Sequence, residues 1–247
     1  MTDVASSIRR FELPSAGTVY KSAYRMVAYF GLLSVFGSQI YGFRYDPLAP
    51  AGNWWFDILL YAGFLVPHLI MSRAWFKRAF WGNPAGLPRE RRFYIGVTLA
   101  TWFAVLILHR PVAGPALSLP PVVPFIGIVM FLLCVLLFFQ GITFSMIDGL
   151  VGVPGTVSAY SHGAETPLFT EGPYAEVRHP MYRAATLGAL SSLFIHPHVA
   201  QLLWTSMIVG TFLAFIPVEE RQLIAARGDA YGDYKRRTPY RLFRGIW

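Results

Sequence analysis

Apolar blocks of membrane-spanning length run through most of this chain, and they leave it few ways to fold. The first four blocks cover residues 22–43, 54–71, 93–108 and 122–147. A helix needs about 20 apolar residues to cross the hydrocarbon core of a bilayer, so all four blocks qualify, the third marginally. Because a helix in lipid satisfies its own backbone hydrogen bonds, each block is predicted to be helical.

Two shorter apolar blocks follow at 182–195 and 199–217, with the tripeptide His-Pro-His between them. Such a short separation is typical of a helical hairpin, and the first of the two blocks is short for a complete crossing. We therefore expect an all-α polytopic membrane protein with about six hydrophobic segments, of which five are full spans. Residues 1–147 are expected to form a four-helix membrane region, and residues 148–247 a separate C-terminal region.

Composition supports a membrane protein and excludes several other classes. The chain is 55% hydrophobic and 14% charged, whereas soluble domains carry about 25% charged residues. Its single cysteine, Cys134, excludes a disulfide framework and a cysteine metal site. We expect no metal, since ligation by His196 and His198 would need partners from elsewhere. The net charge of +8 is attributed to topology rather than to nucleic-acid binding.

The distribution of basic residues predicts the orientation. Arginine and lysine gather in the N-terminal arm, in residues 72–92 and in the tail 218–247. The linkers 44–53 and 109–121 contain one arginine each. Cytoplasmic loops are enriched in Lys and Arg, so both termini are predicted to be cytoplasmic. The polar segment 148–181 then lies on the cytoplasmic side as well.

Two polar clusters interrupt the apolar pattern in the C-terminal region. The first, at 171–184, contains Tyr174, Glu176, Arg178, His179, Tyr182 and Arg183. The second is Glu219-Glu220-Arg221, directly after the last apolar block. Adjacent helical residues point about 100° apart, so at most one glutamate can face a given pocket. The other is expected to pair with Arg221 or solvent, and a simple charged helix end at the interface is the alternative interpretation.

The string Arg-His-Pro-Met-Tyr at 178–182 predicts the start of a helix. Proline disfavours helix for His179 and suits the first helical turn at Pro180. The unsatisfied N–H groups of a helix start favour anions, and Tyr174 and Tyr182 are candidates for cation–π contact with a sulfonium. Alternatively, His179 is an interfacial histidine hydrogen-bonded to a backbone carbonyl.

The two clusters together resemble a known family. The string GPYAEVRHPMY at 172–182, followed by EERQLIAARGDAYGDYKRRTP at 219–239, is similar to the isoprenylcysteine carboxyl methyltransferase superfamily, to which phospholipid N-methyltransferases are related. These are integral membrane enzymes that use S-adenosyl-L-methionine. In the front half, PHLIMSRAWFKR at 67–78 and PRERRFY at 88–94 are similar to NnrU-like proteins and bacterial methanethiol S-methyltransferases, and they favour that branch.

The resemblance implies a cofactor site in the C-terminal region 148–247, on the cytoplasmic face. It places S-adenosyl-L-methionine against Thr166, Pro167, Leu168, Phe169, Tyr174, His179, Pro180, Met181, Tyr182 and Glu219. Phe215 stands where prenylcysteine enzymes have a substrate-binding arginine, and we expect Phe215 and Arg183 to contact the substrate. Further candidates to line or cap the site are His68, Arg73, Tyr231 and Tyr234, although a kink, lipid headgroups or an interfacial helix explain them equally well.

These observations predict a methyltransferase of a bacterial inner membrane that acts on a small thiol such as methanethiol, giving dimethyl sulfide. Because the thiolate is the nucleophile, a proton must leave the thiol; His179, Glu219 and water are the candidate acceptors. Arg178 or Arg183 is expected to favour the anion electrostatically. Two alternatives remain, a lipid or isoprenylcysteine methyltransferase and a non-enzymatic NnrU-like accessory protein of nitrogen-oxide respiration.

Overall fold

The computed structural model describes residues 15–41, 46, 48–82, 88–141, 144–153 and 168–247. In these residues the regular structure is helical apart from an isolated bridge between Ala116 and His198, which confirms the all-α prediction. The helices are α1 (Ala16–Tyr41), α2 (Asn53–Met71), α3 (Ala74–Trp81), α4 (Pro88–Leu108), α5 (Val122–Gly141), α6 (Phe144–Val151), α7 (Pro173–Glu176), α8 (Pro180–Ile195), α9 (Val199–Arg227) and α10 (Asp229–Arg237).

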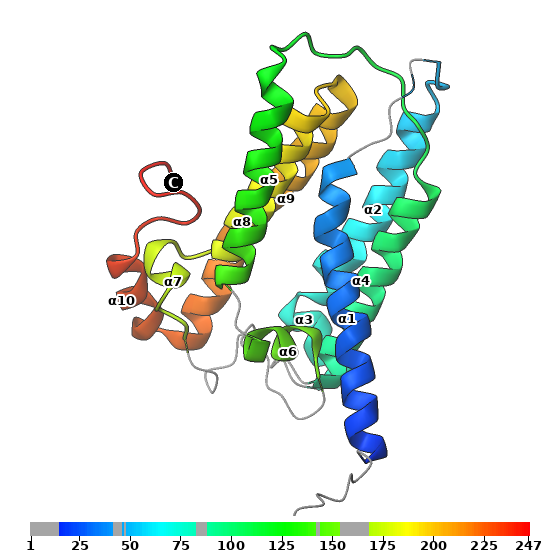
Figure 1. The fold of residues 1–247 in the computed structure, drawn as a ribbon. Helices are drawn as coiled ribbons and strands as arrows, with labels where there is room; N and C mark the ends of the chain where they lie inside the picture. The colour runs from blue at the N-terminus through cyan, green and yellow to red at the C-terminus, as the bar shows by residue number, and fades with distance from the viewer. Residues whose placement is uncertain (1–14, 42–45, 47, 83–87, 142–143, 154–167) are drawn as a thin grey trace, which may run out of the picture.

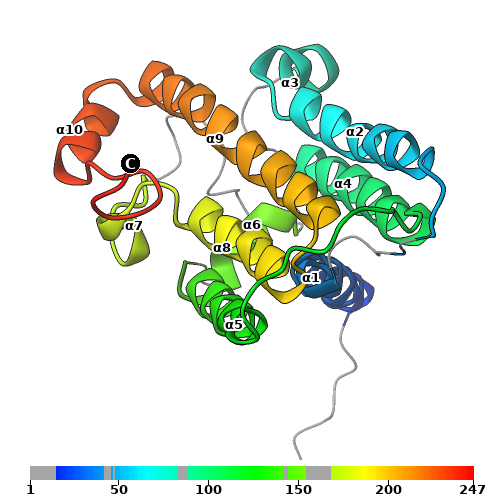
Figure 2. The same cartoon turned by 90° about the horizontal axis from the view of Figure 1, so that it is seen from above.

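The long helices form two groups that stand side by side. Helices α5, α8 and α9 form one group, and α1, α2 and α4 form the other (Figures 1 and 2). Helix α8 packs most extensively on α5 and also contacts α9 and α1, so it joins the groups. An added Cβ on Gly127 of α5 would lie 2.8 Å from the backbone nitrogen of Ile195, which shows how closely α5 and α8 approach.

Four of the helices are long and apolar enough to cross a membrane. Their spans are Asn53–Met71, Arg89–Leu108, Val122–Gln140 and Val199–Arg227. In the described residues, α1 and α8 do not meet the same combined requirement of length and apolarity. The chain is therefore a membrane protein, while six hydrophobic segments with five full crossings remain a prediction.

One predicted boundary was wrong. The fourth apolar block was expected to continue to residue 147, but α5 ends at Gly141 and α6 is a separate helix from Phe144 to Val151. The last apolar block ends at Pro217, and α9 continues through this proline to Arg227. Proline removes one helical hydrogen bond, and packing around a membrane helix can compensate for that loss.

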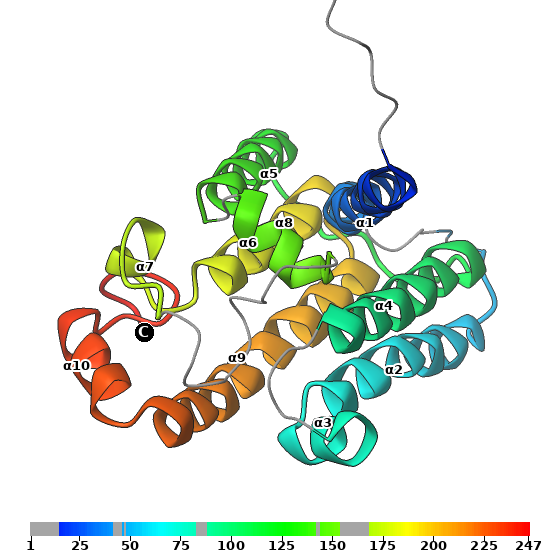
Figure 3. The same cartoon turned by 90° about the horizontal axis from the view of Figure 1, so that it is seen from below.

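The short helices gather at one end of the bundle. Helix α3, within the basic segment 72–92, lies at this end with α6, α7 and α10 (Figures 1 and 3). Gly228, with a φ of 52°, separates α9 from α10, a left-handed conformation that favours glycine. The tail thereby turns back toward the start of α8.

At the opposite end, the loops before α5 and α9 lie together. The Leu117 amide donates to the Pro197 carbonyl over 2.7 Å. Buried Asp57 and His109 approach to 2.8 Å, and the amide of Arg110 donates to the same carboxylate over 3.1 Å. This end of the bundle is closed by polar contacts between a loop and α2.

Two hydrophobic clusters hold the helices together. One joins Tyr61 of α2 and Trp102 of α4 to Ala189 of α8 and Trp204 of α9. The other joins Ala28 of α1, Phe138 of α5, Ile147 and Val151 of α6, and Ala184 of α8. Both clusters combine residues from before and after position 147; the division into two regions at that position remains a prediction.

Candidate active site

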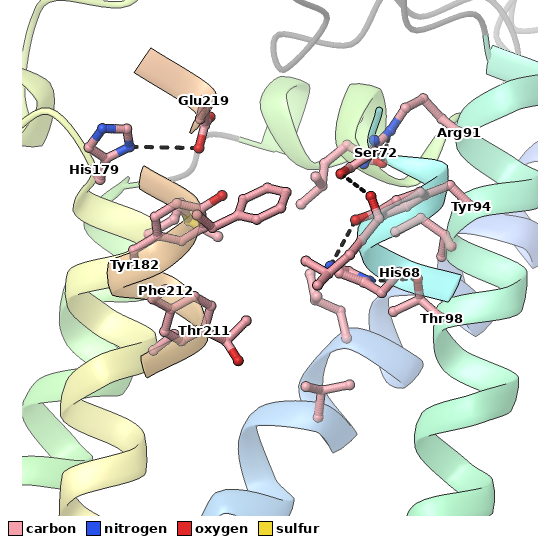
Figure 4. Close-up of a pocket in the computed structure, with 18 of the residues that line it drawn as sticks. His68, Ser72, Arg91, Tyr94, Thr98, His179, Tyr182, Thr211, Phe212 and Glu219 are labelled. Carbon is pink, nitrogen blue, oxygen red and sulfur yellow. Dashed lines mark hydrogen bonds and ion pairs between the residues drawn. The ribbon is translucent and has the colours of Figure 1, made fainter. Parts of the chain in front are cut away.

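A cavity of about 430 Å³ lies between the two helix groups. Its walls come from α1, α2, α4, α8 and α9, with further residues from α6 and α10. Figure 4 shows His179, Tyr182, Phe212 and Glu219 facing His68, Tyr94 and Thr98 across this space. Of the residues predicted from sequence, the cavity is lined by Leu168, Phe169, Tyr174, Arg178, His179, Pro180, Met181, Tyr182, Phe215 and Glu219.

His179 begins the aromatic part of the C-terminal wall. It is the N-cap of α8 and Pro180 is the first helical residue, which confirms the predicted helix start. The His179 ring stacks on Tyr182 with a centroid separation of 5.6 Å and an interplanar angle of 5°. Tyr182 stacks in turn on Phe212 of α9 at 5.1 Å. A continuous aromatic surface therefore runs from the start of α8 onto α9.

The two adjacent glutamates of α9 have different environments, as their helical spacing predicted. Glu219 lines the cavity, and its Oε2 atom is buried without a hydrogen-bond partner in the described residues. The same atom lies 3.8 Å from Nδ1 of His179. Glu219 therefore presents an available carboxylate oxygen to a ligand, next to an imidazole that can carry a positive charge.

Glu220 is buried at 3% exposure and surrounded by cations. Its carboxylate lies 2.6 Å from Nε of Arg178, 3.3 Å from Arg241 and 3.7 Å from Lys235. The expected partners, Arg221 or solvent, were therefore wrong, and Arg221 is exposed. The reason is that the C-terminal tail folds back and brings Lys235 and Arg241 to this carboxylate.

The tail also occupies hydrogen-bonding groups at the start of α8. The amides of Arg178 and His179 donate to the carbonyls of Tyr240 and Arg241 over 2.9 and 3.0 Å. The Arg178 guanidinium donates to the carbonyls of Thr238 and Pro239 over 2.8 and 2.6 Å. With Glu220 and two carbonyls around it, Arg178 mainly anchors the tail to the first polar cluster, although it also borders the cavity.

One predicted substrate contact, Arg183, is not part of the cavity lining. Its Nη1 atom is 3.0 Å from Glu176, whose side chain is largely exposed. Thr166 and Pro167 lie outside the described residues. Phe215 does line the cavity, and the guanidinium of Arg73 stands 5.1 Å from its ring centroid.

Helix α10 adds two tyrosines to the site. Tyr231 and Tyr234 are buried and line the cavity, in agreement with the expectation that they cap it. Burial raises the pKa of both phenols well above the ordinary value, so both remain protonated donors. Tyr234 donates to the carbonyl of Tyr174 over 2.8 Å, whereas the Tyr231 hydroxyl has no partner in the described residues.

Apart from His68, the polar residues of the N-terminal wall were missed by sequence reasoning. This wall carries His68, Ser72, Lys77, Arg91, Tyr94 and Thr98. Lys77 lies 3.5 Å from Glu90 with both side chains almost fully buried. Burial lowers the pKa of Lys77, and the nearby Glu90 carboxylate partly opposes this effect. The available signal was the pair of motifs at 67–78 and 88–94, but nothing in their sequence indicates that they face His179 and Glu219.

Comparison with known proteins gives this geometry a chemical context. Residues 123–229 match the family model for phospholipid methyltransferases. The chain is 28% identical over 193 residues to methanethiol S-methyltransferase 2 of Bradyrhizobium diazoefficiens, covering 74% of this chain and 70% of that protein. It is 27% identical over 192 residues to methanethiol S-methyltransferase of Crocosphaera subtropica, with coverages of 74% and 72%.

A shorter match connects the chain to a further type of methyltransferase. It is 34% identical over 73 residues to protein-S-isoprenylcysteine O-methyltransferase of Schizosaccharomyces pombe, covering 29% of this chain and 31% of that protein. With the apolar helices and the cavity, these matches identify the chain as a membrane methyltransferase. Parts of it are similar to the isoprenylcysteine and phospholipid methyltransferases, and its longer matches are with methanethiol S-methyltransferases.

Proposed function

We propose that this protein transfers the methyl group of S-adenosyl-L-methionine to a small thiol such as methanethiol, at the cytoplasmic face of a bacterial inner membrane. The observation that carries the proposal is the position of Glu219. Glu219 lines the cavity beside an aromatic stack, and its buried Oε2 atom has no hydrogen-bond partner in the described residues. A buried carboxylate is costly unless its oxygens are hydrogen-bonded, and a bound cationic ligand would offset that cost.

The residues of the C-terminal wall fit a sulfonium cofactor. Glu219 offers a carboxylate to an amino or ribose hydroxyl group, and Tyr231 offers a buried hydroxyl. Tyr174 and Tyr182 line the same space, and aromatic rings attract cations within about 6 Å. Leu168, Phe169, Pro180 and Met181 supply apolar contacts around these groups. When bound, the sulfonium would supply the activated methyl group.

The size and lining of the cavity favour a small acceptor. Ligand pockets span about 300–1,000 Å³, and a volume of about 430 Å³ leaves little room beyond a nucleoside-containing cofactor. The acceptor side is lined by aromatic rings: the ring centroid of Phe64 lies 5.0 Å from that of Trp102 and 5.8 Å from that of Tyr61. A small volatile thiol dissolves in such surroundings, whereas a long prenyl or acyl chain needs a longer channel.

Catalysis then depends on alignment. Methyl transfer is an in-line displacement, and fixing the two reactants in such a geometry can lower a barrier by about 7–11 kcal/mol. The two helix groups lie on opposite sides of one cavity (Figure 4). We call the side with His179 and Glu219 the donor wall, because it would bind the cofactor. The side with His68, Tyr94 and Thr98 is the acceptor wall, which would face the thiol. The chain thus orients the reactants and excludes water between them.

A substrate screen tests the proposal. Purified protein is incubated with methyl-labelled S-adenosyl-L-methionine and alkanethiols of increasing length, together with a phospholipid amine and a prenylcysteine. We expect labelled thioether from methanethiol, with rates that fall as the alkyl chain grows. Transfer to the lipid amine or prenylcysteine without transfer to any thiol would overturn the proposed acceptor class.

Two variants, one inside the cavity lining and one outside it, test where the acceptor binds. Trp102→Ala enlarges the acceptor side of the cavity, whereas Trp75→Ala removes a ring that is 57% exposed and outside the lining. We expect the first variant to shift the preference toward longer thiols and the second to leave the preference unchanged. An unchanged preference in Trp102→Ala would place the acceptor elsewhere.

A further inference from the structure

His68 occupies an unusual place on the acceptor wall of the cavity. Its Nε2 atom lies 2.8 Å from the hydroxyl of Tyr94, and its Nδ1 atom lies 3.1 Å from the hydroxyl of Thr98. Both partners belong to α4, while His68 belongs to α2, and all three residues line the cavity. Figure 4 shows this group facing Glu219 and His179 across the open space.

The two hydroxyls allow His68 to change its protonation state without losing a contact. In the neutral ring one nitrogen donates and the other accepts, and in the charged ring both donate. A hydroxyl can act as donor or acceptor. With Nδ1–H donating to Thr98 and Nε2 accepting from Tyr94, a proton can arrive at Nε2 while both hydrogen bonds remain.

The surroundings of His68 suit a neutral base. Phe64 stacks on its ring at 5.7 Å, and Arg91 stands 4.7 Å from the ring centroid of Tyr94. Lys77 is the other cation on this wall, and it is paired with Glu90. Among the cavity residues in the described parts of the chain, Glu219 is the one carboxylate, and it lies on the opposite wall.

The other candidate proton acceptors of the cavity already interact with a charged group or are needed to bind the methyl donor. The ring nitrogens of His179 lie 3.8 Å from Glu219 and 3.4 Å from Glu220. Glu219 is the group that offers a negative charge to the cationic methyl donor. A base on the acceptor wall leaves both donor-side groups unchanged during the reaction.

We propose that His68, acting through the hydroxyl of Tyr94, receives the proton of the acceptor thiol. This inference rests on the proposed thiol methyltransferase function. The thiol S–H proton moves to Oη of Tyr94 as the phenolic proton moves to Nε2 of His68. The electron pair left on sulfur forms the new S–CH₃ bond, and the bond between the methyl carbon and the sulfonium breaks, with its electrons returning to the donor sulfur. The imidazolium later releases its proton to water.

Thiols with the same carbon skeleton and different acidity test this relay. Ethanethiol and trifluoroethanethiol have the same skeleton, but the fluorines acidify the second thiol. The assay pH is set where the fluorinated thiol is mostly thiolate and ethanethiol is not. General-base catalysis contributes about 10²–10⁴-fold, so we expect Tyr94→Phe and His68→Asn to lower kcat/KM for ethanethiol by about 100-fold or more. The loss with trifluoroethanethiol should be at least about tenfold smaller.

Two controls make the test decisive. Thr101→Val removes a hydroxyl of α4 that donates to the Val97 carbonyl and lies outside the cavity lining; this variant should methylate both thiols at wild-type rates. Calorimetry should give an unchanged affinity of Tyr94→Phe and His68→Asn for S-adenosyl-L-methionine, because the donor wall is intact. If His68→Asn does not fold, the nearly isosteric Tyr94→Phe still allows the losses with the two thiols to be compared.

The outcomes separate this inference from the proposed function. Equal losses with the two thiols in both variants would overturn the relay while leaving thiol methylation in place. A wild-type protein that binds the cofactor but methylates no thiol would overturn the relay and the thiol function together. A selective loss with ethanethiol, at unchanged cofactor affinity, would support the relay.

Discussion

Both ends of the helical bundle bury a carboxylate against a histidine, but they use the pair differently. At the loop end, Asp57 is 2.8 Å from His109 and also accepts the Arg110 amide, and neither residue of the pair lines the cavity. At the cavity end, Glu219 is 3.8 Å from His179, and both residues line the cavity. A carboxylate packed against a histidine therefore does not by itself mark a functional site; a position on the cavity wall does.

The same contrast exists between neighbouring residues of α9. Glu220 is enclosed by Arg178, Lys235 and Arg241, whereas Glu219 faces the cavity. One carboxylate fixes the tail onto the start of α8, and the next is left for a ligand. Substitutions of these and comparable residues test the comparison. The four predictions below run from the largest expected effect to the smallest.

Removing Arg178 should have the largest effect on stability. Arg178→Ala leaves Glu220 buried without its nearest cation and frees the carbonyls of Thr238 and Pro239. Breaking one partner of a buried ion pair typically costs about 3–5 kcal/mol, and thermal unfolding in detergent should show a loss of this order. Arg183→Ala, which breaks an ion pair with exposed Glu176, should cost at most about 1 kcal/mol. Similar losses in the two variants would refute the structural role of Glu220.

Neutralising Glu219 should affect ligand binding rather than folding. A hydrogen bond to a charged group contributes about 1.5–3 kcal/mol, so Glu219→Gln should weaken S-adenosyl-L-methionine binding by about 10- to 100-fold. Calorimetry measures the affinity, and the melting temperature without ligand should change little. Glu176→Gln, at an exposed position of α7, provides the matched control. An unchanged affinity would move the cofactor away from this wall.

Removing Asp57 should destabilise the protein without changing cofactor binding or methyl transfer. Asp57→Ala leaves the Arg110 amide and His109 without their common acceptor. Loss of a buried partner costs about 1–3 kcal/mol, which denaturation should detect. Cofactor affinity and methyl transfer by the folded variant should equal those of the wild type, and any selective loss of activity would contradict the division between the two ends.

The smallest effect is expected at α6, through its dependence on pH. Burial would raise the pKa of Asp148, but hydrogen bonds from Arg25 and Tyr29 outweigh it and hold the pKa below the usual value. The contribution of Asp148 to stability is therefore present at neutral pH and is lost as the pH falls below about 4. The stability difference between wild type and Asp148→Asn should close over this acidic range. A difference that grew on acidification would reverse the sign of the inferred shift.

Much of the local structure could be predicted from the sequence. The start of α8 follows from the His179–Pro180 pair, because proline fixes its own backbone and restricts the residue before it. The different environments of Glu219 and Glu220 follow from helical geometry. The resemblance brought the two polar clusters together, and the cavity lining agrees with this grouping. The first two predictions depend only on backbone geometry within a few residues. The third depends on the similarity of a whole motif to a known family.

The failures involve contacts between distant positions. Glu220 was assigned to its neighbour Arg221, but its nearest cation, Arg178, lies 42 positions earlier in the chain. Such contacts depend on the direction in which the tail turns at Gly228 and on the helix against which it then packs.

The sequence by itself therefore determined that the chain is a helical membrane protein, that a helix starts after His179, and that one of two adjacent glutamates can face a pocket. Local hydrogen bonding and the length of apolar blocks decide these features. Only the tertiary structure decided which cations enclose Glu220, and that His68 and Tyr94 stand across the cavity from Glu219. Those arrangements arise from the packing of α8 against α5, α9 and α1, which brings together residues that no local pattern connects.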